Sequence, residues 1–78
     1  MELKDFITKF SQQFFETDAS EFKADTVFKE LEEWSSLSVI QIIAMVDAEY
    51  GVTIDGVAIK EAETIQDLFN EVLSRKQK

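Results

Sequence analysis

The stretch LEEWSSLSVIQIIAMVDAEYGV, residues 31–52, predicts the clearest helix of the chain. Ser35 suits the position before the first turn, because its side-chain oxygen can accept from a free amide there. Gly51 suits the position after the last turn, where a left-handed conformation costs glycine little. More than half of the helix circumference is apolar, so we expect a central helix. The apolar residues between the two caps include Leu37, Ile40, Ile43, Ala44, Met45 and Val46.

Upstream of this helix, a second apolar pattern predicts an amphipathic helix over residues 2–16. Its apolar residues recur every three or four positions, at Leu3, Phe6, Ile7, Phe10 and Phe14. Residues 17–34 would then form a connection, which is long for a compact domain. We expect the apolar residues in this connection to hold it against the core, with a short helical turn within residues 26–32.

Downstream, residues 52–54 are expected to be extended or to turn, and residues 55–62 to form a short third helix. Thr64 is predicted to cap a last helix, with Asp67 three positions on in a variant of the capping box. The inward stripe of this helix would be Ile65, Leu68, Phe69, Val72 and Leu73, and basic residues at 75–78 suit its negative end. The prediction is an all-α four-helix bundle. It has three long helices, a short third helix and a long loop between the first two, in a single domain spanning residues 1–78.

The composition limits the chemistry that this chain can perform. Of its 78 residues 45% are hydrophobic, which indicates a packed core, and it contains no cysteine, histidine or proline. A serine nucleophile therefore lacks a histidine base, and transition metals lack their preferred ligands. Sixteen acidic residues against eight basic ones give a net charge of −8, which repels nucleic acid and anionic lipid. We expect a cytoplasmic protein with basic protein partners, without membrane insertion.

An alternation of oxygen-bearing residues after residue 46 resembles the start of a calcium loop. It consists of Asp47, Glu49, Gly51, Thr53 and Asp55. Val52 stands where the sharp turn needs glycine, and Ala58 stands where a bidentate glutamate should close the site. The pattern favours a solvated helix end followed by a turn over a calcium-responsive module.

The three serines at residues 35, 36 and 38 are predicted to differ in role. If Ser35 caps the helix, the Ser36 hydroxyl points outward in the first turn, near free amides and the positive end of the helix dipole. Such a serine is accessible to another enzyme and can hold a phosphate ester favourably. Ser38 is expected to be a solvated residue of the same turn.

Residues 34–52 resemble the acyl carrier protein family. The family motif is Asp-Ser-Leu at the start of the second helix, followed by an apolar helix that ends in acidic residues, an aromatic residue and Gly-Val or a similar pair. The modified serine falls on Ser36, the leucine on Leu37 and the aromatic residue on Tyr50. Ser35 replaces the aspartate of the motif. The resemblance extends over essentially the whole chain, through the order of the helices and the strong acidity.

The resemblance implies a carrier that is not itself an enzyme. A phosphopantetheinyl transferase would attach 4′-phosphopantetheine from coenzyme A to Ser36, and the thiol of the arm would carry acyl groups as thioesters. The pathway would be fatty-acid biosynthesis or a specialised lipid or polyketide-type synthesis, and the bundle interior would shelter the acyl chain.

The resemblance also implies how the carrier meets its partners. The acidic second helix, including Gln41, Asp47 and Glu49, would dock a monomeric carrier onto basic patches of acyl-transferring and synthase enzymes. The alternative is a carrier-like acidic adaptor or scaffold protein that is not modified.

Overall fold

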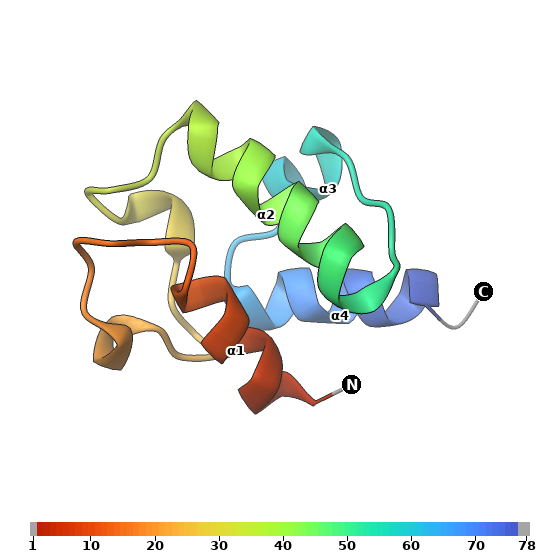
Figure 1. The fold of residues 1–78 in the computed structure, drawn as a ribbon, viewed down its shortest axis with the longest axis horizontal. Coiled ribbons are helices and arrows are strands. Elements are labelled where there is room, and N and C mark those ends of the chain that lie inside the picture. Colours follow the sequence, from red (N-terminus) through yellow and green to blue (C-terminus); the bar gives the residue numbers. More distant parts are fainter. Residues whose placement is uncertain (1, 77–78) are drawn as a thin grey trace.

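The computed structural model describes residues 2–76, which form four α-helices and two short 3₁₀ turns (Figure 1). The α-helices are α1 (Leu3–Ser11), α2 (Ser36–Tyr50), α3 (Gly56–Glu61) and α4 (Ile65–Lys76). The 3₁₀ turns η1 (Ala19–Glu21) and η2 (Phe28–Glu30) lie in the connection between α1 and α2. Helices α1 and α3 each contact both α2 and α4, so the four helices enclose one core. The predicted all-α bundle, with its short third helix and long first loop, is confirmed.

Aromatic side chains hold the long connection against the core. The ring centroids of Phe28 and Phe10 lie 5.4 Å apart, those of Phe28 and Trp34 5.0 Å, and those of Phe14 and Phe22 5.3 Å. Phe10 and Phe28 are fully buried. Because such ring pairs add to the free energy gained by burial, the loop is an integral part of the bundle, as predicted, and η2 is its expected helical turn.

The prediction that the first helix runs to residue 16 is wrong, because α1 ends at Ser11. The Glu33 carboxylate replaces the helical acceptors of the residues that follow. Its Oε2 accepts from the Phe15 N–H at 2.8 Å, and its Oε1 accepts from the Glu16 and Thr17 N–H groups at 3.1 and 3.0 Å. Three successive amides therefore converge on one side chain that lies 16–18 residues later in the chain.

The remaining helix ends agree closely with the predictions. Gly51 ends α2 in the left-handed conformation, with φ of 66°, and the Asp55 side chain caps α3 by accepting from the Ala58 N–H at 3.0 Å. Thr64 and Asp67 cap α4 reciprocally. The Thr64 hydroxyl accepts from the Asp67 N–H at 3.1 Å, and the Asp67 carboxylate accepts from the Thr64 N–H at 3.2 Å. Helix α4 is described to Lys76, and the last two predicted residues, 77 and 78, lie outside the described residues.

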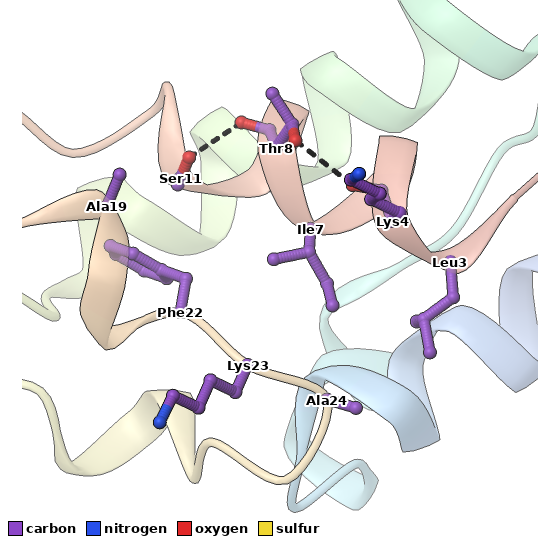
Figure 2. A pocket seen from close by; sticks show the side chains of 9 residues that line it. All are labelled: Leu3, Lys4, Ile7, Thr8, Ser11, Ala19, Phe22, Lys23 and Ala24. Carbon is purple, nitrogen blue, oxygen red and sulfur yellow. Dashed lines mark hydrogen bonds between the residues drawn. The ribbon is translucent and has the colours of Figure 1, made fainter.

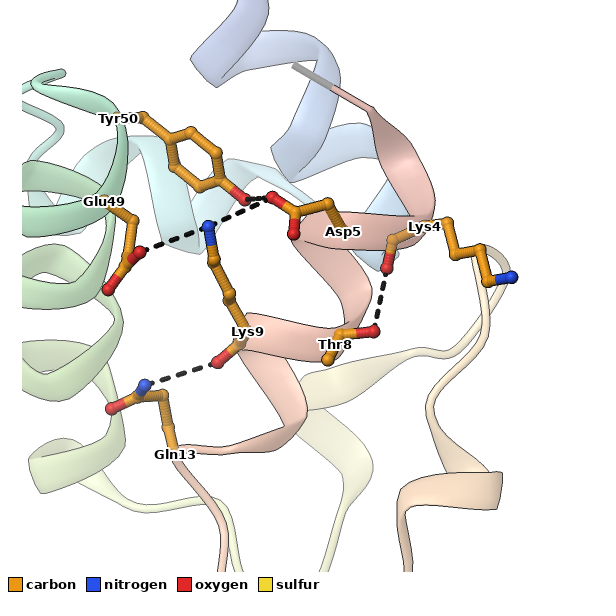
Figure 3. Close-up of polar contacts among 7 residues, drawn as sticks. All are labelled: Lys4, Asp5, Thr8, Lys9, Gln13, Glu49 and Tyr50. Atoms are coloured by element: carbon orange, nitrogen blue, oxygen red, sulfur yellow. Dashed lines mark hydrogen bonds and ion pairs between the residues drawn. The ribbon is translucent and has the colours of Figure 1, made fainter.

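A polar cluster joins α1 to the end of α2 (Figure 3). The Lys9 ammonium lies 3.1 Å from carboxylate oxygens of both Asp5 and Glu49. The Tyr50 hydroxyl donates to Asp5 at 3.0 Å, and Lys9 lies over the Tyr50 ring at 5.2 Å from its centroid. This cluster fixes the end of α2 that is opposite Ser36, so it supports the helix without taking part in the candidate site.

Candidate functional site

Ser36 is the first residue of α2 and is exposed. Ser35 precedes it as the N-cap, in an extended conformation with φ of −149° and ψ of 177°. The first amides of a helix lack acceptors within the helix, and they form the positive end of its dipole. No acidic residue lies in the first turn of α2 to oppose an anion there. The Ser36 hydroxyl is therefore accessible, and its surroundings suit a phosphate ester.

Ser38 is not the solvated residue that the sequence suggested, since only 4% of it is exposed. Its hydroxyl accepts from the Ser35 N–H at 3.1 Å, and its own N–H donates to the Ser35 carbonyl at 3.0 Å. The Ser35 side chain faces the Ser38 N–H as the other half of a capping box, but it makes no full capping hydrogen bond. Ser35 therefore occupies the predicted cap position, but it is the Ser38 hydroxyl that makes the side-chain hydrogen bond at this helix end. The sequence signal for this role is a second serine at the third helical position.

The apolar circumference of α2 divides into a buried and an exposed face. Ile42, Met45 and Val46 are buried in the core. Leu37 is 60% exposed and Ile40 is 63% exposed, so the expectation of a central helix holds for one face only. Ser36, Leu37 and Ile40 lie close together in helical positions, which places an apolar surface next to the candidate attachment serine.

The three predicted docking residues occupy different surroundings. Gln41 is half-buried and lines a groove of about 230 Å³ together with Ser35, Leu37 and Phe15. Asp47 is exposed. Glu49 forms the ion pair with Lys9, so α1 already engages its carboxylate. Of these three residues, Asp47 best fits the expected acidic contact for a partner.

A larger open groove, of about 510 Å³, lies between α1 and the loop that follows it (Figure 2). Its walls are mainly apolar and come from Leu3, Ile7, Phe22 and Ala24. None of residues 35–38 lines it, so it does not adjoin Ser36. Within residues 2–76 there is no cluster of three or more potential metal ligands. No helix in that part of the chain is long and apolar enough to cross a membrane.

Comparison with known proteins adds one finding to this geometry. A family model described as "Phosphopantetheine attachment site" matches residues 5–72, which include all of α2 and most of the other three helices. In the same comparisons no curated protein and no solved structure matched.

Proposed function

The chain belongs to the acyl carrier family of phosphopantetheine-carrying proteins, and we propose that Ser36 bears the arm. Domains of this family are sites of covalent 4′-phosphopantetheine attachment, and they carry acyl groups without being catalysts themselves. The observation that supports Ser36 is its exposure at the first position of α2. The nearby Ser38 is buried, and the Ser38 hydroxyl already accepts a hydrogen bond from the Ser35 N–H.

Attachment would be a phosphoryl transfer from coenzyme A. The Ser36 hydroxyl would lose its proton to a base of the transferase, and its oxygen would bond to the phosphorus that carries pantetheine. The bond from this phosphorus to the bridging oxygen would break, releasing adenosine 3′,5′-bisphosphate. The resulting phosphodiester is an anion, which the start of α2 favours through its amides and dipole.

The attached thiol would then carry acyl groups as thioesters, in fatty-acid biosynthesis or in a specialised lipid or polyketide-type synthesis. The chain has no cysteine, so the arm would supply its only thiol. We further propose that the chain is a monomer and a single domain; the single domain is supported by one continuous core cluster that draws on all four helices.

The partners would be a phosphopantetheinyl transferase and the acyl-transferring and synthase enzymes that use the thioester. Leu37 and Ile40 offer these enzymes an exposed apolar surface, and Asp47 offers a carboxylate for their basic patches. Partner docking would therefore combine apolar contact near Ser36 with attraction between opposite charges farther along α2.

Intact-mass measurement tests the assignment of Ser36. Incubation with coenzyme A and a broad-specificity phosphopantetheinyl transferase should add one phosphopantetheinyl group to the wild-type chain. Ser36→Ala should abolish the addition, whereas Ser35→Ala should retain it. Unchanged mass of the wild-type protein with several transferases would contradict the proposal.

A second candidate function is an acidic adaptor or scaffold that is never modified. It is favoured by Ser35, which stands where the family motif has aspartate. This function predicts that Ser36→Ala has no effect in the native host, while Asp47→Lys disrupts a partner complex.

A further inference from the structure

Phe15 has an unusually exposed aromatic side chain. It is 89% exposed, whereas the adjacent Phe14 is 7% exposed and packs in the core. Phe15 lies in the segment that leaves α1, between Ser11 and the first 3₁₀ turn. Exposed apolar residues mark interaction sites when they form a contiguous patch, whereas single ones are common on protein surfaces.

The backbone around Phe15 is held on both sides. Its own N–H donates to Glu33 at 2.8 Å, and the next two amides donate to the same carboxylate. On the other side, the Phe14 ring packs 5.3 Å from Phe22 and 6.2 Å from Trp34, centroid to centroid. Because the backbone of this segment is already held, covering Phe15 would cost little backbone conformational entropy.

Phe15 and Leu37 line the same groove of about 230 Å³ beside the start of α2. Ser35 also lines it, so the groove is bordered by the residues immediately before and after Ser36. An enzyme that brings its active site to the Ser36 hydroxyl must approach this part of the surface. The groove is therefore continuous with the area that a modifying enzyme has to cover.

The groove offers such an enzyme two exposed apolar side chains, Phe15 and Leu37, among polar ones, and little charge. Glu33 is its one charged lining residue, and its two carboxylate oxygens already accept from the amides of residues 15–17 and from the Thr17 hydroxyl. On α2 the first carboxylate is that of Asp47, about 16.5 Å along the helix axis from Ser36. Aromatic residues, phenylalanine among them, are enriched in the cores of protein–protein interfaces.

We propose that Phe15, together with Leu37, forms the apolar contact by which a phosphopantetheinyl transferase positions itself on Ser36. This inference rests on the proposed function, since it names a recognition residue for the same modification. It assigns Phe15 as a specificity-determining residue, held by Glu33, that takes no part in the transfer itself. Before the transfer the chain carries no arm, so in this step Phe15 contacts the transferase and not the arm.

Initial rates of phosphopantetheine addition test this role. The substrates are the wild-type chain, Phe15→Ala and Phe15→Leu, with coenzyme A and one broad-specificity transferase. We expect Phe15→Ala to lower kcat/KM about tenfold, equivalent to about 1.4 kcal/mol, through a higher KM at unchanged kcat. Phe15→Leu should lower kcat/KM less, because leucine keeps part of the apolar surface. Val27→Ala, which shortens another exposed apolar residue of the same connection, should match the wild type.

Circular dichroism and thermal unfolding of each variant establish that the fold is retained, as expected for an 89% exposed ring. Wild-type kinetics for Phe15→Ala would overturn the inference, while loss of modification in Ser36→Ala would leave the proposed function standing. If Phe15→Ala is modified normally but its acyl thioester hydrolyses faster, Phe15 covers the arm, and the transferase contact is refuted. Failure of the wild type to accept the arm would contradict both proposals.

Discussion

Ser36 and Ser38 differ in what their hydroxyls contribute, and stability measurements can separate them. Ser38→Ala removes the acceptor of the Ser35 N–H at the start of α2. We expect it to lower the free energy of unfolding by about 1 kcal/mol, which corresponds to a fall in Tm of about 4–8 °C for a domain of this size. Ser36→Ala is the matched control and should unfold like the wild type. Urea unfolding followed by circular dichroism measures both variants, and equal losses would contradict the assigned roles.

Tyr50 provides a second test at the residue scale, because it is the one tyrosine of the chain. Burial, and after it the hydrogen bond to Asp5, raise the pKa of Tyr50 from 10.0 to about 12. The fold thus favours the neutral phenol. Its contribution to stability should be complete below pH 10 and be lost as the pH rises from 10 towards 12.

Ultraviolet titration of the tyrosinate absorbance measures this pKa directly. Asp5→Asn should bring the pKa of Tyr50 back towards 10.0, because it removes a nearby negative charge and a charged acceptor. Asp25→Asn, in an exposed part of the long connection, should leave the titration unchanged. A wild-type tyrosine that titrates at its ordinary value would refute the contact shown in Figure 3.

The residues that the sequence predicted correctly are those whose role depends on near neighbours in the chain. Ser35, Gly51 and Thr64 stand at helix ends because capping needs only the next few amides or a single positive φ. The prediction that Ser38 is solvated is wrong, because a serine in a first turn is compatible with both solvation and capping. Its burial depends on side chains that pack over it, and their positions follow only from the fold.

At the scale of elements, the Glu33 carboxylate holds the segment in which the first helix gives way to the loop. Burial raises the pKa of Glu33, but hydrogen bonds from Phe15, from the Thr17 side chain and from the amides of residues 16 and 17 outweigh it, so the pKa is lowered. A lowered pKa means that the fold favours the carboxylate. Its stabilising contribution is present above the ordinary value of 4.5 and is lost as the pH falls below it.

We therefore expect Glu33→Gln to loosen the segment from Phe15 to Thr17. Amide hydrogen exchange of these residues should become faster, and the variant should lose less stability than the wild type between neutral pH and acid. Glu32→Gln changes an exposed neighbour and should leave both measurements unchanged. Unaltered exchange at Phe15 in Glu33→Gln would show that packing of Phe14 alone holds the segment.

The prediction for the end of the first helix is wrong because it could not take account of the Glu33 carboxylate. Residues 12–16 contain no glycine or proline and continue the apolar spacing as far as Phe14, so local rules extend the helix. The carboxylate that captures the amides lies 16–18 residues away. The other helices ended where predicted because their caps lie within a few residues of the ends they close.

At the scale of the whole molecule, the net charge of −8 is distributed unevenly. Glu33 and Glu49 are engaged by the amides of the loop and by Lys9, and the exposed surface beside Ser36 is formed by Leu37 and Ile40. The total charge follows from composition, but the distribution of charge around Ser36 does not, because it depends on which carboxylates the fold engages. Long-range attraction would thus guide a basic partner, and apolar contact would hold it at Ser36.

Because charge would guide the partner and apolar contact would hold it, we expect kcat/KM to depend on salt in charge variants but not in apolar variants. Asp47→Lys should lower kcat/KM for phosphopantetheine addition at least about fivefold at low salt, because loss of an exposed ion pair costs up to about 1 kcal/mol and the new positive charge also repels a basic partner. The difference should vanish near 1 M salt, where the Debye length is about 3 Å. Ile40→Ser should remain impaired at both salt concentrations, because apolar contact is not screened by ions.

Glu2→Lys is the matched control for Asp47→Lys, since it makes the same change in net charge at an exposed residue that precedes α1. If its kcat/KM equals that of the wild type, the position of Asp47 on α2 is what the partner recognises. If both reversals lower kcat/KM equally, total charge guides the encounter and Asp47 is not a docking residue. Glu49→Lys is unsuitable for this comparison, because it would also break the ion pair with Lys9 that fixes α2 to α1.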